Sequence, residues 1–302
     1  MLFSSGPQKN ADEPAVEDAA DDLLRDRSIG EILGSAKGWT AAQIDSVIAY
    51  QRQHHLRFGD AAVATGAARP DEVMWALSQQ FHYHYKPTPG VHMHDELVMA
   101  NHPFSDEVEA FRDLRSQLVM GAMATRSAHR ALAVVSADVG DGKTFVAANL
   151  AVAFSQLPGH TLLIDADMRS PRLHKVFGLD SGAAGLSGIL SGRSEASVIR
   201  PVSELPNLSV LPVGAVPPNP LELLQRAAFG LLLDELTGKF DHVLVDTPAA
   251  AHGSDARVIA AACGLTLVVG RKNHTHTAAL QSLMDHLTRG PATVAGILMN
   301  DY

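Results

Sequence analysis

The chain has 302 residues, of which 46% are hydrophobic and 19% charged, and its formal net charge is −9. This length fits one large domain or two unequal ones, and the apolar content is sufficient for a packed core. The negative charge argues against a nucleic-acid partner and against direct binding to anionic lipid. The single cysteine, Cys263, excludes an intrachain disulfide and is expected to be a small buried hydrophobic residue.

Residues 1–27 are predicted to form a disordered acidic tail, because the stretch ADEPAVEDAADDLLRD (residues 11–26) is rich in carboxylates. The first ten residues contain no apolar core of a secretory signal. The longest uncharged apolar run, residues 258–270, has 13 residues, whereas a bilayer span takes roughly 20. We therefore expect no transmembrane segment and a cytoplasmic location.

Residues 28–85 contain a repeat with an offset of 29 residues. The segments 29–51 and 58–80 both open on an apolar residue, a glycine and an acidic residue, and both close on a glutamine. The apolar residues before each glutamine are spaced so that they lie on one face of a helix. This pattern predicts a small helical domain made of two helix-pair units.

Residues 86–105 are predicted to be a linker, because they continue a proline-rich stretch. Histidines gather in the linker and just before it, at His82, His84, His92, His94 and His102. No cysteine accompanies them, so they are expected to be surface side chains rather than metal ligands.

From residue 106 onward, short apolar runs alternate with helical stretches. The expected strands are 131–136, 161–165, 207–213, 242–246, 265–270 and 293–299. The expected helices between them are 144–156, 219–237, 254–262 and 275–289. Unbroken apolar strands between helices are typical of a mostly parallel sheet that is buried on both faces.

The stretch SADVGDGKTF, residues 136–145, stands between an expected strand and an expected helix. It matches the phosphate-binding pattern G-x4-G-K-[S/T], except that Ala137 replaces the first glycine. In such P-loops backbone N–H groups cradle phosphates, the lysine reaches the outer phosphates, and the threonine hydroxyl binds Mg²⁺. We expect ATP and Mg²⁺ as ligands, with the nucleotide on Gly140, Asp141, Gly142, Lys143, Thr144 and Phe145. The predicted fold class is α/β: a P-loop NTPase with a mostly parallel sheet covered by helices on both faces, plus a small N-terminal helical domain.

Three aspartates stand at or just after the carboxyl ends of expected strands: Asp165 and Asp167 on one strand, and Asp246 on another. Ligands of open α/β sheets bind at this edge, so the three carboxylates are expected to converge on the P-loop. The predicted catalytic residues are Lys143, Asp165 and Asp167. The predicted metal site is formed by Thr144, Asp165 and Asp246.

Residues 106–302 resemble the bacterial tyrosine kinases, the BY-kinase family. LLIDADMR (162–169) matches the family's second Walker motif, and VLVD (243–246) matches its Walker B motif. EAFRDLR (109–115) matches the family's E-x2-R-x2-R motif with Glu109, Arg112 and Arg115. In the family this helix contacts a neighbouring subunit and closes a ring. The resemblance therefore implies an ATP-dependent tyrosine autokinase that self-associates through this stripe.

With its N-terminal repeat, the whole chain most resembles the exopolysaccharide-associated EpsG or chain-length-determinant tyrosine kinases. This resemblance implies control of exopolysaccharide polymerisation, chain length and export. It also implies a separate membrane-spanning chain-length-determinant activator, which would hold the protein peripherally at the inner membrane. The family's phosphate acceptors are tyrosines near the C-terminus, so Tyr302 is the predicted acceptor, with Tyr83 and Tyr85 next.

Residues 28–85 resemble the N-terminal domain of type II secretion ATPases. Some such domains bind cyclic di-GMP through two Arg-apolar-Gly repeats. The second repeat here has Arg57, but the first has Ser28 in the equivalent place. A docking or structural role is favoured, because one guanidinium of a symmetric phosphate clamp is missing.

Two alternatives to the kinase stay open. One is a non-kinase P-loop ATPase switch or scaffold of the polysaccharide machinery, which the lone terminal tyrosine favours. The other is a cyclic di-GMP-sensing N-terminal domain with a subordinate ATPase.

Overall fold

The computed structural model describes residues 28–80, 92–102, 105–124, 130–180, 184–193 and 198–301. The chain divides into two compact units, Met1–Val91 and His92–Tyr302. The predicted tail (1–27), His82, His84, Tyr83, Tyr85 and Tyr302 lie outside the described residues. In the described part, no helix is both long enough and apolar enough to cross a bilayer.

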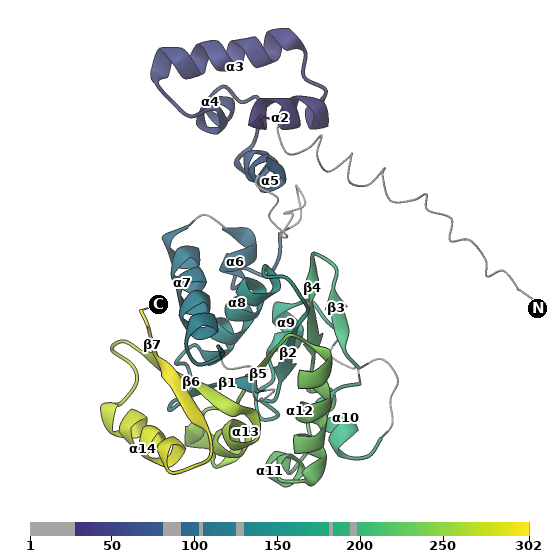
Figure 1. The fold of residues 1–302 in the computed structure, drawn as a ribbon, viewed down its shortest axis with the longest axis vertical. Coiled ribbons are helices and arrows are strands. Elements are labelled where there is room, and N and C mark those ends of the chain that lie inside the picture. The colour runs from purple at the N-terminus through teal and green to yellow at the C-terminus, as the bar shows by residue number, and fades with distance from the viewer. Residues whose placement is uncertain are drawn as a thin grey trace, which may run out of the picture. The chain divides into compact units, whose positions relative to one another are not determined.

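The first unit is helical, with α2 (Ile29–Lys37), α3 (Ala41–His54), α4 (Phe58–Ala64) and α5 (Pro70–Gln80) (Figure 1). The sequence sets the starts of α2 and α3 through capping boxes, in which Ser28 pairs with Glu31 and Thr40 pairs with Gln43. The apolar faces of the helices meet in a small core that includes Leu33, Val47, Ala61 and Ala76. The predicted N-terminal helical domain is therefore confirmed.

The repeated glycines of this unit are packing positions. A Cβ atom on Gly30 would lie 3.0 Å from the Phe58 ring, and one on Gly59 would lie 2.6 Å from Val73. A side chain at either place would push the neighbouring element away. The apolar-Gly-acidic repeat is thus explained by the close approach of elements within the unit.

The second unit is built on one seven-stranded sheet in the order β3-β4-β2-β5-β1-β6-β7. Its strands are β1 (Ala131–Ser136), β2 (Thr161–Asp165), β3 (Arg200–Val202), β4 (Leu205–Leu211), β5 (His242–Asp246), β6 (Gly264–Arg271) and β7 (Thr293–Asn300). All pairings are parallel except the one between β3 and β4. The predicted mostly parallel sheet is confirmed. Sequence reasoning missed β3, because it has only three residues at a sheet edge, of which only Val202 is buried, and they form no hydrophobic run.

Helices cover both faces of the sheet (Figure 1). One layer has α6 (Val98–Asn101), α7 (Asp106–Met120) and α8 (Lys143–Ser155), and the other has α12 (Ala227–Lys239), α13 (Asp255–Cys263) and α14 (Thr277–Thr288). Short helices occupy the connections: α9 (Leu173–Val176), α10 (Leu186–Leu190), α11 (Pro220–Leu224) and the 3-10 turn η1 (Ala250–His252). The predicted helix 219–237 is divided into α11 and α12, because Arg226 has an extended backbone. Cys263 is buried, as expected.

Residues 92–102, which the sequence assigns to the linker, belong to the second unit in the structure. Leu97 and Met99 are fully buried. The Asn149 side chain of α8 accepts a hydrogen bond from the Met99 N–H and donates one to the Glu96 carbonyl. This short apolar run packs on the P-loop helix because the contact buries apolar surface. His92, His94 and His102 belong to no group of three or more potential metal ligands among the described residues.

Candidate functional site

The P-loop joins β1 to α8. Gly140 and Gly142 have φ values of 89° and 93°, a conformation that favours glycine. A Cβ on Gly142 would also lie 2.3 Å from the amide nitrogen of Asn300. Ala137 is buried and is not among the residues with positive φ. Alanine therefore replaces the first glycine of the pattern without backbone strain.

Three successive carbonyl groups of the P-loop are held from one side. The Val139 carbonyl accepts from His274 Nε2 at 2.9 Å, the Gly140 carbonyl from Arg271 Nη1 at 3.3 Å, and the Asp141 carbonyl from Asn300 Nδ2 at 3.2 Å. In a planar trans peptide the C=O and the following N–H point in opposite directions.

The N–H groups of Gly140, Asp141 and Gly142 therefore face away from these three donors. They have no hydrogen-bond partner among the described residues. A run of unpaired N–H groups at the start of a helix is a concave site for an anion such as a phosphate.

Lys143 and Thr144 form the first turn of α8. The Lys143 ammonium nitrogen lies 3.8 Å from Asp167 Oδ2, and both side chains are nearly buried. Thr144 is 5% exposed. The lysine predicted to reach the outer phosphates is thus close to one of the three predicted carboxylates.

Asp165 and Asp246 are neighbours across the sheet, because β2 and β5 pair in a register that sets one opposite the other. Both side chains are fully buried. Desolvation, together with the nearby charge of Asp246, raises the pKa of Asp165 well above its ordinary value. Desolvation also raises the pKa of Asp246 to about 7, although the Lys143 charge and the nearby Thr144 hydroxyl oppose this rise.

The three carboxylates differ in the oxygens that they leave available. Asp165 accepts from the Asp167 and Leu173 N–H groups, one on each oxygen. Asp246 accepts from the Thr247 N–H with Oδ1, while its Oδ2 is buried without a hydrogen-bond partner among the described residues. An orphaned carboxylate oxygen near a threonine hydroxyl fits a hydrated Mg²⁺ ion, which is usually held by few protein ligands and several waters.

The two arginines of the predicted stripe on α7, Glu109, Arg112 and Arg115, make different contacts in the structure. Arg112, with a half-buried side chain, pairs at 2.9 Å with Glu109, which is exposed. Arg115 turns inward and donates to the Ala153 carbonyl of α8 at 2.7 Å. Burial, followed by the Arg112 charge, lowers the pKa of the Arg115 guanidinium. Arg115 therefore has a contact within the unit that the sequence pattern did not indicate.

An apolar groove of about 290 Å³ lies beside the P-loop between α7 and the end of β7. The Phe145 ring, directly after Thr144, packs edge-on against Phe111 of α7 with ring centroids 5.8 Å apart. Asn300, whose amide holds the P-loop carbonyl, also lines the groove. The groove therefore borders the P-loop through Phe145 and Asn300.

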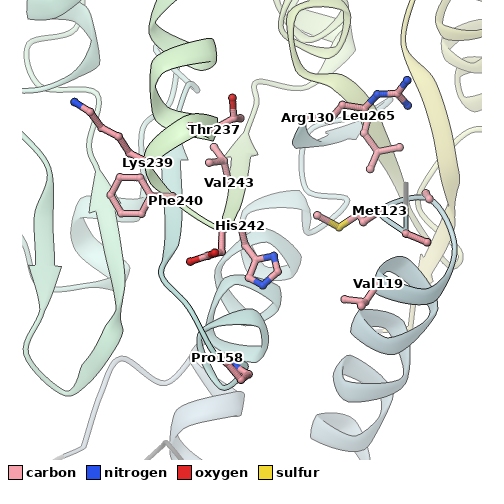
Figure 2. Close-up of a pocket in the computed structure, with 14 residues that line it drawn as sticks. Val119, Met123, Arg130, Pro158, Thr237, Lys239, Phe240, His242, Val243 and Leu265 are labelled. Atoms are coloured by element: carbon pink, nitrogen blue, oxygen red, sulfur yellow. The ribbon is translucent and has the colours of Figure 1, made fainter. Parts of the chain in front are cut away.

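A second cavity of about 630 Å³ lies at the opposite, amino-terminal end of the strands. Figure 2 shows Val119 and Met123 on one side of it, and His242 and Val243 on the other. Burial lowers the pKa of His242, which favours the neutral imidazole. None of the predicted site residues lines this cavity.

The site thus combines residues that the sequence pattern predicted with residues that it missed. The P-loop, Lys143 and the three aspartates come together at one edge of the sheet. Arg271, His274, Thr275 and Asn300 were not predicted, because they lie more than a hundred residues from the loop that they contact. Their only sequence signal is their position at the carboxyl ends of the last two strands.

Known proteins agree with this geometry. The family model described as the CobQ/CobB/MinD/ParA nucleotide binding domain matches residues 132–302. The chain is 34% identical over 205 residues to the tyrosine-protein kinase wzc of Salmonella typhi, an alignment that covers 68% of this chain and 28% of that protein. It is 30% identical over 207 residues to the putative tyrosine-protein kinase CapB of Staphylococcus aureus, covering 68% of this chain and 88% of that one. The kinase domain of the Escherichia coli tyrosine kinase ETK superimposes with a TM-score of 0.63 and 33% identity, over 68% of this chain and 79% of that one.

The chain therefore belongs to the CobQ/CobB/MinD/ParA nucleotide-binding family and, within it, to the bacterial tyrosine-protein kinases. The relationship predicted from the sequence motifs is confirmed. The chain spans about a quarter of the length of the Salmonella relative.

Proposed function

We propose that this protein is an ATP-dependent protein-tyrosine autokinase. The observation that carries the proposal is the run of unpaired N–H groups on Gly140, Asp141 and Gly142, next to Lys143 and three buried or nearly buried carboxylates. Membership of the bacterial tyrosine-protein kinases supports the choice of tyrosine as the acceptor.

In this proposal the ATP phosphates bind the P-loop N–H groups, and the Lys143 ammonium binds the outer phosphates. The apolar groove with Phe111 and Phe145 is large enough for the adenine base, and Phe145 directly follows the P-loop threonine. Thr144 and Asp246 would hold the Mg²⁺ ion, together with Asp165, which lies opposite Asp246 in the sheet register. Bound Mg²⁺ would neutralise charge on the transferred phosphate and the departing ADP.

The transfer step requires a proton acceptor. A tyrosine hydroxyl attacks the terminal phosphorus, the bond from phosphorus to the bridging oxygen breaks, and ADP leaves with that electron pair. We propose Asp167 Oδ2 as the acceptor of the hydroxyl proton. Asp167 Oδ1 accepts from the Arg169 and Ser170 N–H groups, but Oδ2 lies 3.8 Å from Lys143, beyond hydrogen-bond distance. In Asp165 each oxygen already accepts from an N–H group. Most of the rate enhancement then comes from positioning and charge neutralisation.

The wider assembly is also a proposal. By its resemblance to exopolysaccharide-associated kinases, the protein would regulate polymerisation, chain length and export. Its partners would be other copies in a ring, joined partly through Glu109 and Arg112, and a separate membrane-spanning activator. That activator would hold it peripherally at the cytoplasmic side of the inner membrane.

The test is incubation of the purified full chain with Mg-ATP and a candidate activator tail, followed by phosphosite mapping. We expect phosphotyrosine in the wild type and its loss in Lys143→Met. We also expect that Tyr302→Phe removes most of the phosphotyrosine while ATP hydrolysis continues. Phosphotyrosine that persists in that variant would place the acceptor elsewhere, with Tyr83 and Tyr85 next. Hydrolysis without any phosphotyrosine in the activated wild type would replace the kinase by an ATPase switch.

A further inference from the structure

Asp141 is a buried carboxylate inside the P-loop, with 1% of its surface exposed. Its Oδ2 accepts from the Asp138 N–H at 2.9 Å, and its Oδ1 accepts from the Thr275 hydroxyl at 2.6 Å. No lysine or arginine of the described residues forms an ion pair with it. A negative charge there repels a triphosphate, so the position needs a physical reason other than charge.

The direction of the bond between Thr275 and Asp141 is fixed. Thr275 Oγ1 accepts the Arg271 N–H at 2.6 Å, and a hydroxyl has only one hydrogen to donate. Because the carboxylate can only accept, that hydrogen lies on the bond to Asp141. Thr275 thus connects the backbone of the β6–α14 loop, residues 271–276, to the centre of the P-loop.

The other contacts of the β6–α14 loop fall on the same stretch. The Asp138 carboxylate accepts from the His276 N–H at 3.2 Å. The Val139 and Gly140 carbonyls accept from His274 and Arg271. Every residue from 138 to 141 therefore has a hydrogen bond to the β6–α14 loop, and the Asp141–Thr275 bond is the shortest of them.

We propose that Asp141 and Thr275 are a pair of positioning residues that hold the P-loop in its phosphate-accepting conformation. The pair fixes the β6–α14 loop against residues 138–141, and this loop turns the Val139 and Gly140 carbonyls away from the phosphate. The N–H groups of Gly140 and Asp141 are thereby directed to the bound nucleotide. This inference rests on the proposed nucleotide site and assigns to it residues that do not touch the reacting atoms.

The direction of the change in MgADP affinity on substitution of either residue tests the proposal. If Asp141 were only an acidic residue near the phosphates, Asp141→Ala would strengthen MgADP binding by removing repulsion. A positioning role predicts weaker binding, on the order of tenfold, because a charge-assisted hydrogen bond is lost. Thr275→Val keeps the charge and the side-chain shape but removes the hydroxyl, and should weaken MgADP binding to a similar extent.

Calorimetric titration of the full chain with MgADP measures these constants. Thr275→Ser should restore binding, and Thr277→Val, at an exposed position of the same loop–helix junction, should match the wild type. The double variant Asp141→Ala/Thr275→Val should bind about as weakly as either single variant, since residues that act as a unit are not additive. In steady-state assays KM for ATP should rise while kcat changes by less than about twofold, as expected for loss of uniform binding.

Tighter binding in Asp141→Ala, unchanged binding in Thr275→Val, or full additivity in the double variant would overturn the proposal. Failure of the wild type to bind MgADP would instead overturn the nucleotide site itself. In that event amide hydrogen exchange of Asp138 in the ligand-free protein still decides the matter, because its N–H donates to Asp141 Oδ2. Exchange should be faster in Thr275→Val than in Thr277→Val, and equal rates would refute the pair.

Discussion

The starts of α2 and α3 in the first unit differ from the start of α8 in the second. Every helix begins with N–H groups that have no partner within the helix. In α2 and α3 the side chains of Ser28 and Thr40 accept from these groups in capping boxes. In α8 the N-cap is Gly142, and no side chain caps the helix. One unit uses local side chains to stabilise its own fold, while the other leaves donors available for a ligand.

ATP turnover at the P-loop should be lost when the Lys143 cation is removed. Lys143→Met should lower the ATP turnover rate by at least about a hundredfold, because a positioned charge at the transferred phosphate is lost. Release of ADP from the purified protein is the measurement. Lys175→Met, at an exposed position on α9, is the matched control and should keep wild-type turnover. Equal rates in the two variants would contradict the P-loop assignment.

The buried carboxylates should make the ligand-free protein less stable as the pH rises. The folded-state pKa of Asp246, about 7, lies above the ordinary value of 3.8, so the folded protein binds more protons than the unfolded chain between these values. The free energy of unfolding should therefore fall from about pH 4 to about pH 7. In Asp246→Asn this fall should vanish. Between about pH 4 and a pH above 7, the wild type should therefore lose at most about 4 kcal/mol more of its free energy of unfolding than the variant does.

Urea denaturation at pH 5, 6.5 and 8 measures that difference. Asp234→Asn, on the exposed face of α12, is the control and should follow the wild-type curve. Parallel pH profiles for wild type and Asp246→Asn would show that Asp246 ionises normally in the folded protein.

The α7 stripe should separate into a structural and an interface residue. Arg115→Ala removes the hydrogen bond to the Ala153 carbonyl and should lower the free energy of unfolding by about 1–2 kcal/mol. Arg112→Ala should lower the free energy of unfolding by less than Arg115→Ala does, because its ion-pair partner Glu109 is exposed to solvent. Light scattering should show reduced self-association in Arg112→Ala. A variant that assembles like the wild type would leave this stripe as a solvated helix face.

A small loss of stability, without any change in ATP turnover, is expected at the capped start of α2. Ser28→Ala should lower the stability of the first unit by about 1 kcal/mol, the usual loss for an N-cap hydroxyl, and should leave ATP turnover unchanged. Ser35→Ala, an exposed position within α2, should be neutral or slightly stabilising. A change of turnover in Ser28→Ala would indicate that the first unit acts on the nucleotide site.

Much of the site could be predicted because its signals are local. The glycines, lysine and threonine of the P-loop stand together in the sequence, and Asp165 and Asp246 are recognised as polar ends of buried strands. The hydrogen bond of Arg115 to the Ala153 carbonyl could not be predicted, since a three-residue spacing determines a helix face but not what packs against that face. The burial of Leu97 and Met99 was missed for the same reason, because Asn149, to which the Met99 N–H donates, lies 50 residues further along the chain.

The sequence by itself determined the class of fold, the phosphate loop and the family, because each depends on residues within one strand, loop or helix. Only the tertiary structure decided the burial that raises the pKa values of Asp165 and Asp246, and the register that sets the two residues opposite each other. It also decided which groups hold the P-loop carbonyls, since β6 and β7 reach the loop by sheet pairing rather than by sequence proximity. Desolvation and long-range hydrogen bonding depend on three-dimensional neighbours, and a local pattern does not contain them.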